Sequence, residues 1–315
     1  MKHFISLNDL PNFEQTLALA KQLKANPYAH ETAGKRKTLG LLFFNPSLRT
    51  RLSTQKAAQN LGFNIIVMNF SNEAWALEFE DGTEMRGIRS EHIREAAAVV
   101  SQYCDMVAIR AFATLNNKEQ DEAEIVLNSF TKYAPIPIIN MESATGHPLQ
   151  SLADALTLEE HATPHRPKVV LSWAPHPKAL PHAVGNSFTQ MMQLRDADYV
   201  IANPEGYDLD PEITKNIPIV HNQEEALAGA DFVYAKNWCS YSQYGEVLRN
   251  DAEWMLTLEK MALTNNAKFM HCLPIRRNIV AADGILDGPN SLVIEQANNR
   301  TFAAQAVLKT LLDHA

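Results

Sequence analysis

Residues 38–51 read TLGLLFFNPSLRTR, an apolar run followed by a polar loop and the start of an amphipathic segment. The apolar run Thr38–Phe44 predicts a buried strand, and the apolar spacing over Leu52–Leu61 is typical of a helix. A buried strand that leads through a short loop into a helix is the repeating unit of a parallel sheet covered by helices. This stretch therefore predicts an α/β fold.

The same alternation continues along the rest of the chain. Further strands are expected at Ile65–Phe70, Met106–Arg110, Ile136–Asn140, Val169–Trp173, Tyr199–Ala202, Ile217–Val220, Phe232–Ala235 and Phe269–His271. Further helices are expected at Glu91–Tyr103, Asn117–Lys132, Ser151–His161 and about Gln296–Asp313. The pattern predicts two doubly wound parallel-sheet domains, residues 1–150 and 151–295, with a C-terminal helix at about 296–315 that returns to the first domain. The breaker-rich stretch Ala162–Pro167 marks the approach to the second sheet.

Length and composition narrow the class of protein. A chain of 315 residues is long enough for about two domains. Its formal net charge of -8 argues against nucleic-acid binding, so an anionic ligand would need a local pocket of Arg and Lys. Three cysteines without a CxxC pair indicate neither a disulfide framework nor a metal site. A start without a signal peptide, and no apolar run of about 18 residues, predict a cytoplasmic enzyme without a membrane segment.

The loop Asn45–Arg51 is the first candidate for chemistry. It carries two guanidinium groups and two hydroxyls at the start of a helix, and helix N–H groups and Arg forks suit a phosphate dianion. The alternative is a Ser/Thr helix cap beside solvated Arg side chains. Similar polar residues end other expected strands: Arg110, the HPLQ run at 147–150 and the HCLPIRR run at 271–277. Because ligands bind at the carboxyl ends of strands in such sheets, these groups predict one site.

Cys272 within the HCLP run raises the alternative of a cysteine nucleophile. No His–Asn or His–Asp arrangement in the sequence calls for one, and a Cys in an apolar run is usually a buried structural residue. We therefore expect Cys272 to contribute only its backbone.

The motifs SxRTR, HPxQ and HCLP, in this order and at these separations, resemble the aspartate/ornithine carbamoyltransferase superfamily over nearly the whole chain. The sequence is most similar to the branch that acts on N-acylated ornithine, on the strength of FFNPS at 43–47, Trp75, WAPHP at 173–177, YAKNW at 234–238 and ALTNN at 262–266. The resemblance implies carbamoyl transfer from carbamoyl phosphate to the side-chain amine of an N-acylornithine. It implies no metal and no organic cofactor, since phosphate is itself a good leaving group.

The resemblance also assigns residues. It implies that carbamoyl phosphate is bound by Ser47, Leu48, Arg49, Thr50, Trp75, Arg110, His147, Pro148, Leu149, Gln150, Cys272, Leu273 and Arg300. Among these, it implies catalytic roles for Arg110, His147 and Thr50. Trp75 belongs to a loop that reaches the neighbouring subunit's site in the family, which implies a homotrimer; the alternative is a hydrophobic lid on its own chain.

On the acceptor side, the resemblance implies contacts from Glu142, His176, Asn186, Lys236, Arg276 and Ser90. Ornithine carbamoyltransferases carry an Asp-…-Ser-Met-Gly segment for the free α-amine, and here Asp231–Trp238 places Lys236 in that region. A cation there suits a carboxylate and an acylated, uncharged α-nitrogen. The Pro175–Pro181 stretch resembles the family's threaded loop, which implies a knot in the second domain.

Ser90 bears on the acyl group. Acetyl-selective relatives carry Glu where this chain has Ser90, and a Glu about 4 Å from a succinyl carboxylate would oppose it by about 1–4 kcal/mol. Ser90 removes this opposition, and Arg86 and Arg89 make the loop more cationic, although Ser90 also fits the role of a helix cap. The sequence therefore favours N-succinyl-L-ornithine, with N-succinyl-L-citrulline and phosphate as products in arginine biosynthesis; the alternative acceptor is N-acetyl-L-ornithine.

Two other classes of protein fit the sequence less well. A nucleotide-dependent dehydrogenase would need a GxGxxG turn after the first strand, and no glycine follows Phe44 there. A non-catalytic relative would be indicated by loss of Arg49, Arg110, His147 or Gln150, all of which are present. Aspartate as acceptor is disfavoured because the Lys-bearing loop of that branch is replaced by the loop with Trp75.

Overall fold

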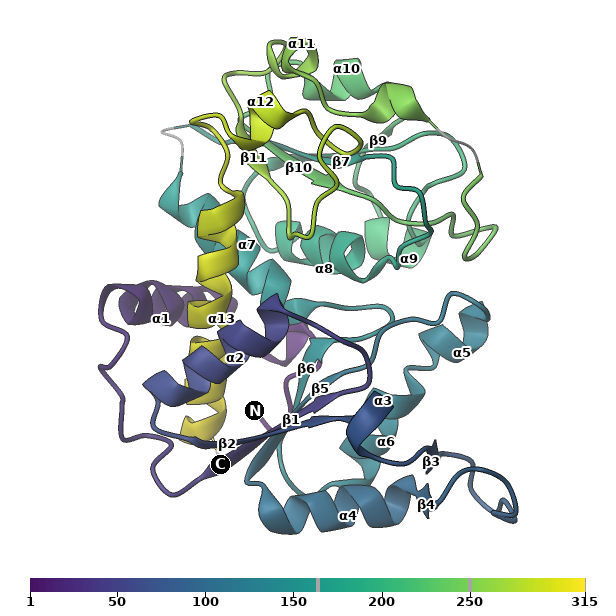
Figure 1. The fold of residues 1–315 in the computed structure, drawn as a ribbon. Coiled ribbons are helices and arrows are strands. Elements are labelled where there is room, and N and C mark those ends of the chain that lie inside the picture. Colours follow the sequence, from purple (N-terminus) through teal and green to yellow (C-terminus); the bar gives the residue numbers. More distant parts are fainter. Residues whose placement is uncertain (163–164, 249–250, 315) are drawn as a thin grey trace. The chain divides into compact units, whose positions relative to one another are not determined.

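The computed structural model of the chain describes residues 1–162, 165–248 and 251–314 (Figure 1). Thr163 and Pro164, within the expected approach to the second sheet, lie outside the described residues. The chain divides into two compact units. Unit 1 comprises Met1–Thr114, Glu119–Leu152 and Arg300–Ala315, and unit 2 comprises Leu115–Lys118 and Ala153–Asn299.

Unit 1 is built on a four-stranded sheet in the order β2-β1-β5-β6, with every neighbouring pair parallel. The strands are β1 (Thr38–Phe43), β2 (Asn64–Asn69), β5 (Met106–Arg110) and β6 (Ile138–Glu142). Parallel pairing of strands that alternate with helices confirms the expected α/β class. The carboxyl ends of β1, β5 and β6 meet at one edge, where the polar loops follow.

Helices cover both faces of this sheet (Figure 1). They are η1 (Leu7–Asp9), α1 (Phe13–Ala25), α2 (Arg49–Asn60), α3 (Phe70–Glu73), α4 (Ile93–Tyr103), α5 (Lys118–Glu122), α6 (Ile125–Tyr133), the start of α7 (Pro148–Glu160) and the end of α13 (Val293–Asp313). On one face, Ile93 and Ala97 of α4 and Phe130 of α6 pack with Val107 and Ile109 in a single apolar core. Burial of each of the larger side chains, Ile, Val or Phe, stabilises the unit by about 2 kcal/mol. On the other face, α2 and α13 are joined by a buried hydrogen bond of 3.0 Å from Asn60 Nδ2 to Gln305 Oε1.

Two expected helices of unit 1 differ from the structure. The helix expected over Glu91–Tyr103 begins only at Ile93, because Glu91 and His92 form β4 (Glu91–His92), which pairs with β3 (Leu77–Glu78). The helix expected over Asn117–Lys132 is two helices, α5 and α6. They are separated at Glu124, whose φ of 47° and ψ of 43° are left-handed and cannot continue a right-handed helix.

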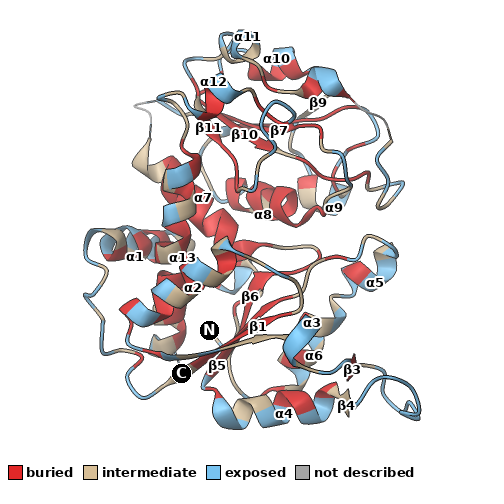
Figure 2. Ribbon diagram, viewed as in Figure 1, coloured by how far each residue is buried: buried red, intermediate tan, exposed pale blue. Residues whose placement is uncertain are grey.

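Unit 2 contains a five-stranded parallel sheet in the order β11-β10-β7-β8-β9. Its strands are β7 (Lys168–Trp173), β8 (Asp198–Ala202), β9 (Ile219–Val220), β10 (Phe232–Lys236) and β11 (Lys268–Met270). Its own helices are α8 (Ala183–Met192), α9 (Pro211–Thr214), α10 (Gln223–Leu227), η2 (Ala252–Trp254), α11 (Leu258–Met261) and α12 (Asp283–Leu286). The strand expected from Ile217 starts two residues later, since Pro218 has no N–H to donate to a ladder. Figure 2 shows the central strands of each sheet as buried.

Buried tryptophans fix the loops that follow β7 and β10. Trp173 Nε1 donates to Trp238 O at 2.9 Å, and Trp238 Nε1 donates to Tyr207 O at 2.6 Å. Both indoles are therefore buried with their only donor satisfied, which lets them contribute a large apolar area without an unpaired polar group. The two indoles therefore hold the loops that follow β7 and β10 in place.

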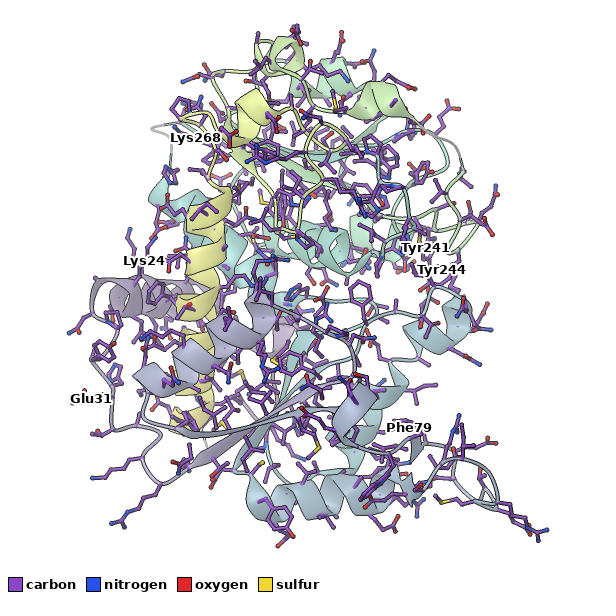
Figure 3. The ribbon with its side chains drawn as sticks, in the orientation of Figure 1. Lys24, Glu31, Phe79, Tyr241, Tyr244 and Lys268 are labelled. Carbon is purple, nitrogen blue, oxygen red and sulfur yellow. The ribbon has the colours of Figure 1, made fainter. Side chains whose placement is uncertain are left out.

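The segment Leu115–Lys118 packs within unit 2, beside the loop that contains Tyr241 and Tyr244 (Figure 3). The Lys118 ammonium lies 3.3 Å from the centre of the Tyr241 ring. Gly245, at φ 80°, makes this approach feasible, because a Cβ there would lie 2.2 Å from Leu115 O. Among residues 1–162, 165–248 and 251–314, no helix has both the length and the apolar character required to cross a membrane.

Candidate active site

The loop after β1 brings the first group of polar residues to the sheet edge. Arg49 and Thr50 are the first two residues of α2, and Ser47 lies in the loop just before it. The N-cap position is Leu48, whose side chain cannot accept a hydrogen bond, so the alternative of a Ser/Thr side-chain cap is wrong for this helix. Thr50 is buried, which places its hydroxyl inside unit 1 rather than in solvent.

Arg110, the last residue of β5, is held by three hydrogen bonds. Its Nε donates to Glu142 Oε2 at 2.9 Å, and its Nη1 donates to Pro46 O at 2.8 Å and to Asn45 O at 3.2 Å. The guanidinium therefore ties together the ends of three neighbouring strands. The two loop carbonyls were not predicted, because sequence patterns carry no information on which carbonyl a distant Arg meets.

Glu142 lies at the centre of the charges in unit 1. Its Oε2 is 3.6 Å from His147 Nε2 and 2.9 Å from Arg110 Nε. Burial alone would raise the pKa of the Glu142 carboxyl, but the charges of His147, Arg110 and Arg300 and the Arg110 hydrogen bond hold this pKa below its ordinary value. Glu142 is therefore an anion that counters several cationic donors.

Arg300 joins this group from helix α13. Its Nη2 donates to Thr50 Oγ1 at 2.5 Å and lies 3.4 Å from His147 Nε2. All five residues of this group are buried; they are Thr50, Arg110, Glu142, His147 and Arg300. Two guanidinium groups against one carboxylate leave a cationic surplus, which suits an anionic ligand with charge on several oxygens. Pro148, Leu149 and Gln150 follow in the first turn of α7, and all three are buried.

Unit 2 carries a second group of cationic side chains. Arg276 Nε donates to His176 Nε2 at 3.1 Å, so this nitrogen carries no proton and Nδ1 donates to Lys178 O at 2.8 Å. Burial lowers the pKa of His176. The charges of Arg276, Lys236 and Lys178 lower this pKa further, whereas the hydrogen bond to the Lys178 carbonyl raises it. His176 is thus neutral beside cations, an arrangement that favours a carboxylate ligand.

The HCLP loop of unit 2 is held in place by hydrogen bonds to buried side chains. His271 N donates to Gln296 Oε1 at 2.9 Å, and Gln296 Nε2 donates to Asp154 Oδ1 at 2.7 Å. Leu273, at φ 55°, donates its N–H to His271 Nδ1 at 2.8 Å. The turn that contains Cys272 and Leu273 is therefore fixed by a buried polar chain. Asp154 and Gln296 had no sequence signal, because both lie within expected helices.

Cys272 is buried, as are Cys104 and Cys239, and none of these three described cysteines forms a disulfide. Asn186, on α8, is also buried. The side chains expected to form one site thus fall into two sets, one in each unit.

Trp75 and Ser90 lie in the segment between α3 and β4. Trp75 is 57% exposed, and its Nε1 donates to Glu91 Oε2 at 2.8 Å. The expectation that Ser90 caps the following helix is wrong: the N-cap of α4 is His92, whose Nδ1 accepts from Arg94 N at 3.2 Å. The Ser90 N–H instead donates to Ala76 O at 3.1 Å.

The charge of this segment also differs from expectation. Arg89 is paired with Glu78 at 2.6 Å, and Arg86 is paired with Glu84 at 2.6 Å. Each guanidinium that was expected to make the loop cationic thus faces a carboxylate. Any effect of this loop on an anionic acyl group therefore depends on Ser90 more than on these two Arg residues.

Comparison with known proteins identifies the family. Residues 2–160 match the carbamoyl-P binding domain of aspartate/ornithine carbamoyltransferase, and residues 182–311 match the Asp/Orn binding domain of the same family. The chain therefore belongs to the aspartate/ornithine carbamoyltransferase family and is a carbamoyltransferase. This confirms the resemblance carried by the SxRTR, HPxQ and HCLP motifs.

Individual relatives are similar over their whole length. N-succinylornithine carbamoyltransferase from Bacteroides fragilis (strain 638R) is 46% identical over 316 residues, which cover 100% of this chain and 99% of that protein. N-acetylornithine carbamoyltransferase from Xanthomonas campestris pv. campestris is 38% identical over 335 residues, covering 99% and 98%. The crystal structure of acetylornithine transcarbamylase complexed with acetylcitrulline matches with a TM-score of 0.93 and 37% identity, covering 99% of each chain.

A further solved structure bears on the acyl group. It is a Glu-to-Ser mutant of N-acetyl-L-ornithine transcarbamylase complexed with carbamyl phosphate and N-succinyl-L-norvaline. It matches this chain with a TM-score of 0.92 and 38% identity, covering 99% of this chain and 100% of that one.

Proposed function

We propose that the protein transfers the carbamoyl group of carbamoyl phosphate to the side-chain amine of N-succinyl-L-ornithine, in arginine biosynthesis. The products are N-succinyl-L-citrulline and phosphate. The observation that carries the proposal is the buried cluster in unit 1, in which Arg110 and Arg300 surround Glu142, His147 and Thr50. The Bacteroides relatives at 46% identity, named for N-succinylornithine, support the choice of acceptor.

In this proposal, unit 1 binds carbamoyl phosphate. The phosphate lies at the start of α2, where Ser47, Arg49, Thr50 and the Leu48 N–H suit its charged oxygens. Arg110 and His147 donate to the carbonyl oxygen, on which negative charge develops as the amine attacks the carbon. Each such donor contributes about 3–4 kcal/mol of transition-state stabilisation. The bond from carbon to the phosphate oxygen then breaks, and the departing phosphate takes the amine proton.

The remaining residues around the carbamoyl group follow from the same assignment. Gln150 and the carbonyls of Cys272 and Leu273 accept hydrogen bonds from the carbamoyl nitrogen. Arg300, which donates to Thr50, and the first turn of α7 with Pro148 and Leu149 complete the site.

Unit 2 binds the acceptor in this proposal. Lys236 and Arg276, beside the neutral His176, favour the α-carboxylate of the acylornithine. Asn186 of unit 2 is assigned to the amide, and Glu142, which belongs to unit 1, is assigned to the side-chain amine. A cation at Lys236 would repel a free α-ammonium, so the proposal predicts poor use of ornithine itself.

Ser90 is assigned to the choice of acyl group. A short neutral side chain here leaves a succinyl carboxylate unopposed, whereas a Glu would repel it. The Glu-to-Ser mutant of the acetylornithine enzyme that holds N-succinyl-L-norvaline supports this assignment. The N-acetylornithine relatives at 38% identity favour N-acetyl-L-ornithine as the second candidate.

The proposal also includes a homotrimer with a knotted second domain. Trp75, more than half exposed, belongs to the loop that is shared between subunits in this proposal. The Pro175–Pro181 loop is the one through which later chain is threaded. Size-exclusion chromatography with light scattering tests the trimer, and a Trp75→Ala variant that stays trimeric but loses activity supports the shared site.

The experiment that tests the reaction compares three acceptors. N-succinylornithine, N-acetylornithine and ornithine are each incubated with carbamoyl phosphate, and citrulline derivatives are measured. We expect a strong preference for the succinyl substrate, a shift toward the acetyl substrate in Ser90→Glu and no shift in the matched Ser90→Ala. Preference of the unaltered protein for the acetyl substrate would overturn the assignment of Ser90, and turnover of ornithine alone would overturn that of Lys236.

A further inference from the structure

Glu124 lies in the turn between α5 and α6, and its carboxylate contacts the loop that precedes His147. Its Oε1 accepts from Ser143 Oγ at 2.7 Å, from Thr145 N at 2.7 Å and from Thr145 Oγ1 at 2.6 Å. Its Oε2 accepts from Ala144 N at 3.2 Å. One carboxylate thus receives hydrogen bonds from three consecutive residues. Hydrogen bonds to an ionised acceptor are about twice as strong as neutral ones.

The loop held in this way connects two parts of the unit 1 cluster. It starts after Glu142, the last residue of β6, and ends at His147, directly before α7. Inside the loop, Ser143 N donates to Gly146 O at 2.7 Å. The side chain of Ser143 also accepts from Asn140 Nδ2 at 3.0 Å, which fastens the loop to β6. A change in the loop would therefore be transmitted directly to the position of His147.

The backbone of Glu124 supports a specific role for this side chain. Its φ of 47° is left-handed, a conformation that is unfavourable for residues other than glycine, asparagine and aspartate. A glycine would adopt it without strain. Strained residues persist where the surrounding contacts fix them, and they concentrate at functional sites. The four hydrogen bonds of the carboxylate are the contacts that fix this one.

We infer that Glu124 is a positioning residue for carbamoyl transfer: it fixes the loop 143–146 so that His147 is held in place for carbamoyl phosphate. Glu124 does not touch the reacting atoms and acts through the loop. The inference rests on the function proposed above and adds to it a residue outside the family motifs. Its effect should fall on carbamoyl phosphate, which unit 1 binds, and not on the acceptor.

Three substitutions separate positioning from stability. Glu124→Ala and Glu124→Gly both remove the carboxylate. Only glycine adopts the left-handed backbone without strain, so Glu124→Gly should unfold at a higher temperature than Glu124→Ala. Both should lose kcat/KM for carbamoyl phosphate by about 10- to 100-fold, the range typical of groups that orient catalytic ligands. The KM for the acylornithine should change little. Glu124→Gln, which keeps an oxygen acceptor, should recover most of the activity.

Asp105→Asn is the matched control. Asp105 Oδ2 accepts from Thr38 N at 2.7 Å, so it also holds a backbone N–H of the same sheet, but at the amino end of β1. This variant should keep the kinetic constants of the unaltered protein. Backbone amide exchange gives a second readout, since exchange at Ala144 and Thr145 should accelerate in Glu124→Gly while the strands of unit 1 stay protected.

The outcomes separate the inference from the function on which it rests. If the unaltered protein makes the carbamoylated product and both carboxylate-free variants keep its kcat/KM, the inference is wrong and the function stands. The inference is also wrong if activity follows unfolding temperature, with Glu124→Gly close to the unaltered protein. If the unaltered protein carbamoylates none of the three acceptors, the proposed function fails and the inference fails with it.

Discussion

The polar groups at the carboxyl ends of the strands are held differently in the two units. In unit 1, the buried carboxylate of Glu142 lies among cationic donors and is paired with Arg110 at 2.9 Å. In unit 2, Arg276 donates to the neutral imidazole of His176, with Lys236 nearby as a second cation. Unit 1 therefore contains its own counter-ion, whereas the guanidinium of Arg276 in unit 2 is bonded to a neutral group, which leaves its charge able to pair with an anionic ligand.

This difference has a physical consequence for binding. A built-in carboxylate keeps the guanidinium of Arg110 oriented without ligand, so little reorganisation is required when an anion binds. A cationic group without a carboxylate partner gains more interaction free energy when an anionic ligand binds. It therefore selects ligands by their charge. We therefore expect substitutions in unit 1 to affect turnover and stability, and those in unit 2 to affect affinity for the acceptor.

The largest expected effect is that of Arg110→Met. It removes the proposed donor to the developing oxyanion and the partner of Glu142, so kcat/KM for carbamoyl phosphate should fall by about 10²- to 10³-fold or more. Steady-state kinetics measure this. The control is Arg166→Met, which removes an exposed guanidinium paired with Asp196 and should leave the rate unchanged. A variant that kept a tenth of the activity would contradict the central position of Arg110.

The second test breaks the charge balance of unit 1. Glu142→Gln removes the counter-ion of Arg110 and should lower the free energy of unfolding by about 3 kcal/mol, as for other broken buried pairs. Phosphate should then stabilise the variant more than the unaltered protein, because a bound anion replaces the lost charge. Urea unfolding with and without phosphate measures both. Glu84→Gln, which breaks an exposed pair with Arg86, should change stability by about 1 kcal/mol or less.

The third test concerns unit 2. Lys236→Met should raise the KM for the acylornithine by about 10- to 100-fold, the range expected for one hydrogen bond to a charged group. The KM for carbamoyl phosphate should not change, because Lys236 is assigned to the acceptor alone. The exposed Lys178 is the control, and Lys178→Met should have little effect. An increase in the KM for carbamoyl phosphate would remove the distinction between the two units.

The smallest effect is the dependence of stability on pH. Burial lowers the pKa of His182 in unit 2. The charge of Lys118 lowers this pKa further, whereas a hydrogen bond to the Cys239 carbonyl raises it. Because the folded pKa lies below the unfolded value of 6.5, this group stabilises the fold fully above that pH. The stabilisation is lost as pH falls from 6.5 through the folded pKa. Thermal unfolding should show a decreasing Tm below this pH, with a flatter profile in His182→Gln.

An unchanged profile in His182→Gln would mean that other groups cause the acid sensitivity. In the folded protein His176 also has a lowered pKa, with burial as the main cause. A His176→Gln variant then separates the two residues, because each substitution should remove only its own part of the pH dependence.

Strand positions could be predicted from the sequence because buried parallel strands are short, continuous apolar runs. Met106–Arg110 was expected and is observed with the same bounds. The strand expected over Ile136–Asn140 is observed at Ile138–Glu142, because Pro137 lacks an N–H and the buried run continues to Met141. The break at Glu124 was missed, since neither glycine nor proline marks it and its cause is a contact with a distant loop.

The candidate site could be predicted only in part. The expectation that strand-end residues meet follows from parallel topology, and Arg110 and His147 do lie around one carboxylate. Glu142 was assigned to the acceptor through the family resemblance, and its contacts with both residues were not foreseen. Arg300 comes from a helix 153 positions after His147, a separation over which sequence pattern gives no information on distance.

Helix α13 runs from Val293 to Asp313, and from Arg300 onward it belongs to unit 1. On the ribosome, most of unit 1 is therefore synthesised before unit 2, while the part of α13 that belongs to unit 1 is synthesised only after unit 2. Until then, Thr50 lacks the Arg300 donor and Asn60 lacks Gln305. A nonsense mutation after Asn299 would leave the whole sequence of unit 2 intact, and its damage would fall on the part of the protein that was translated first.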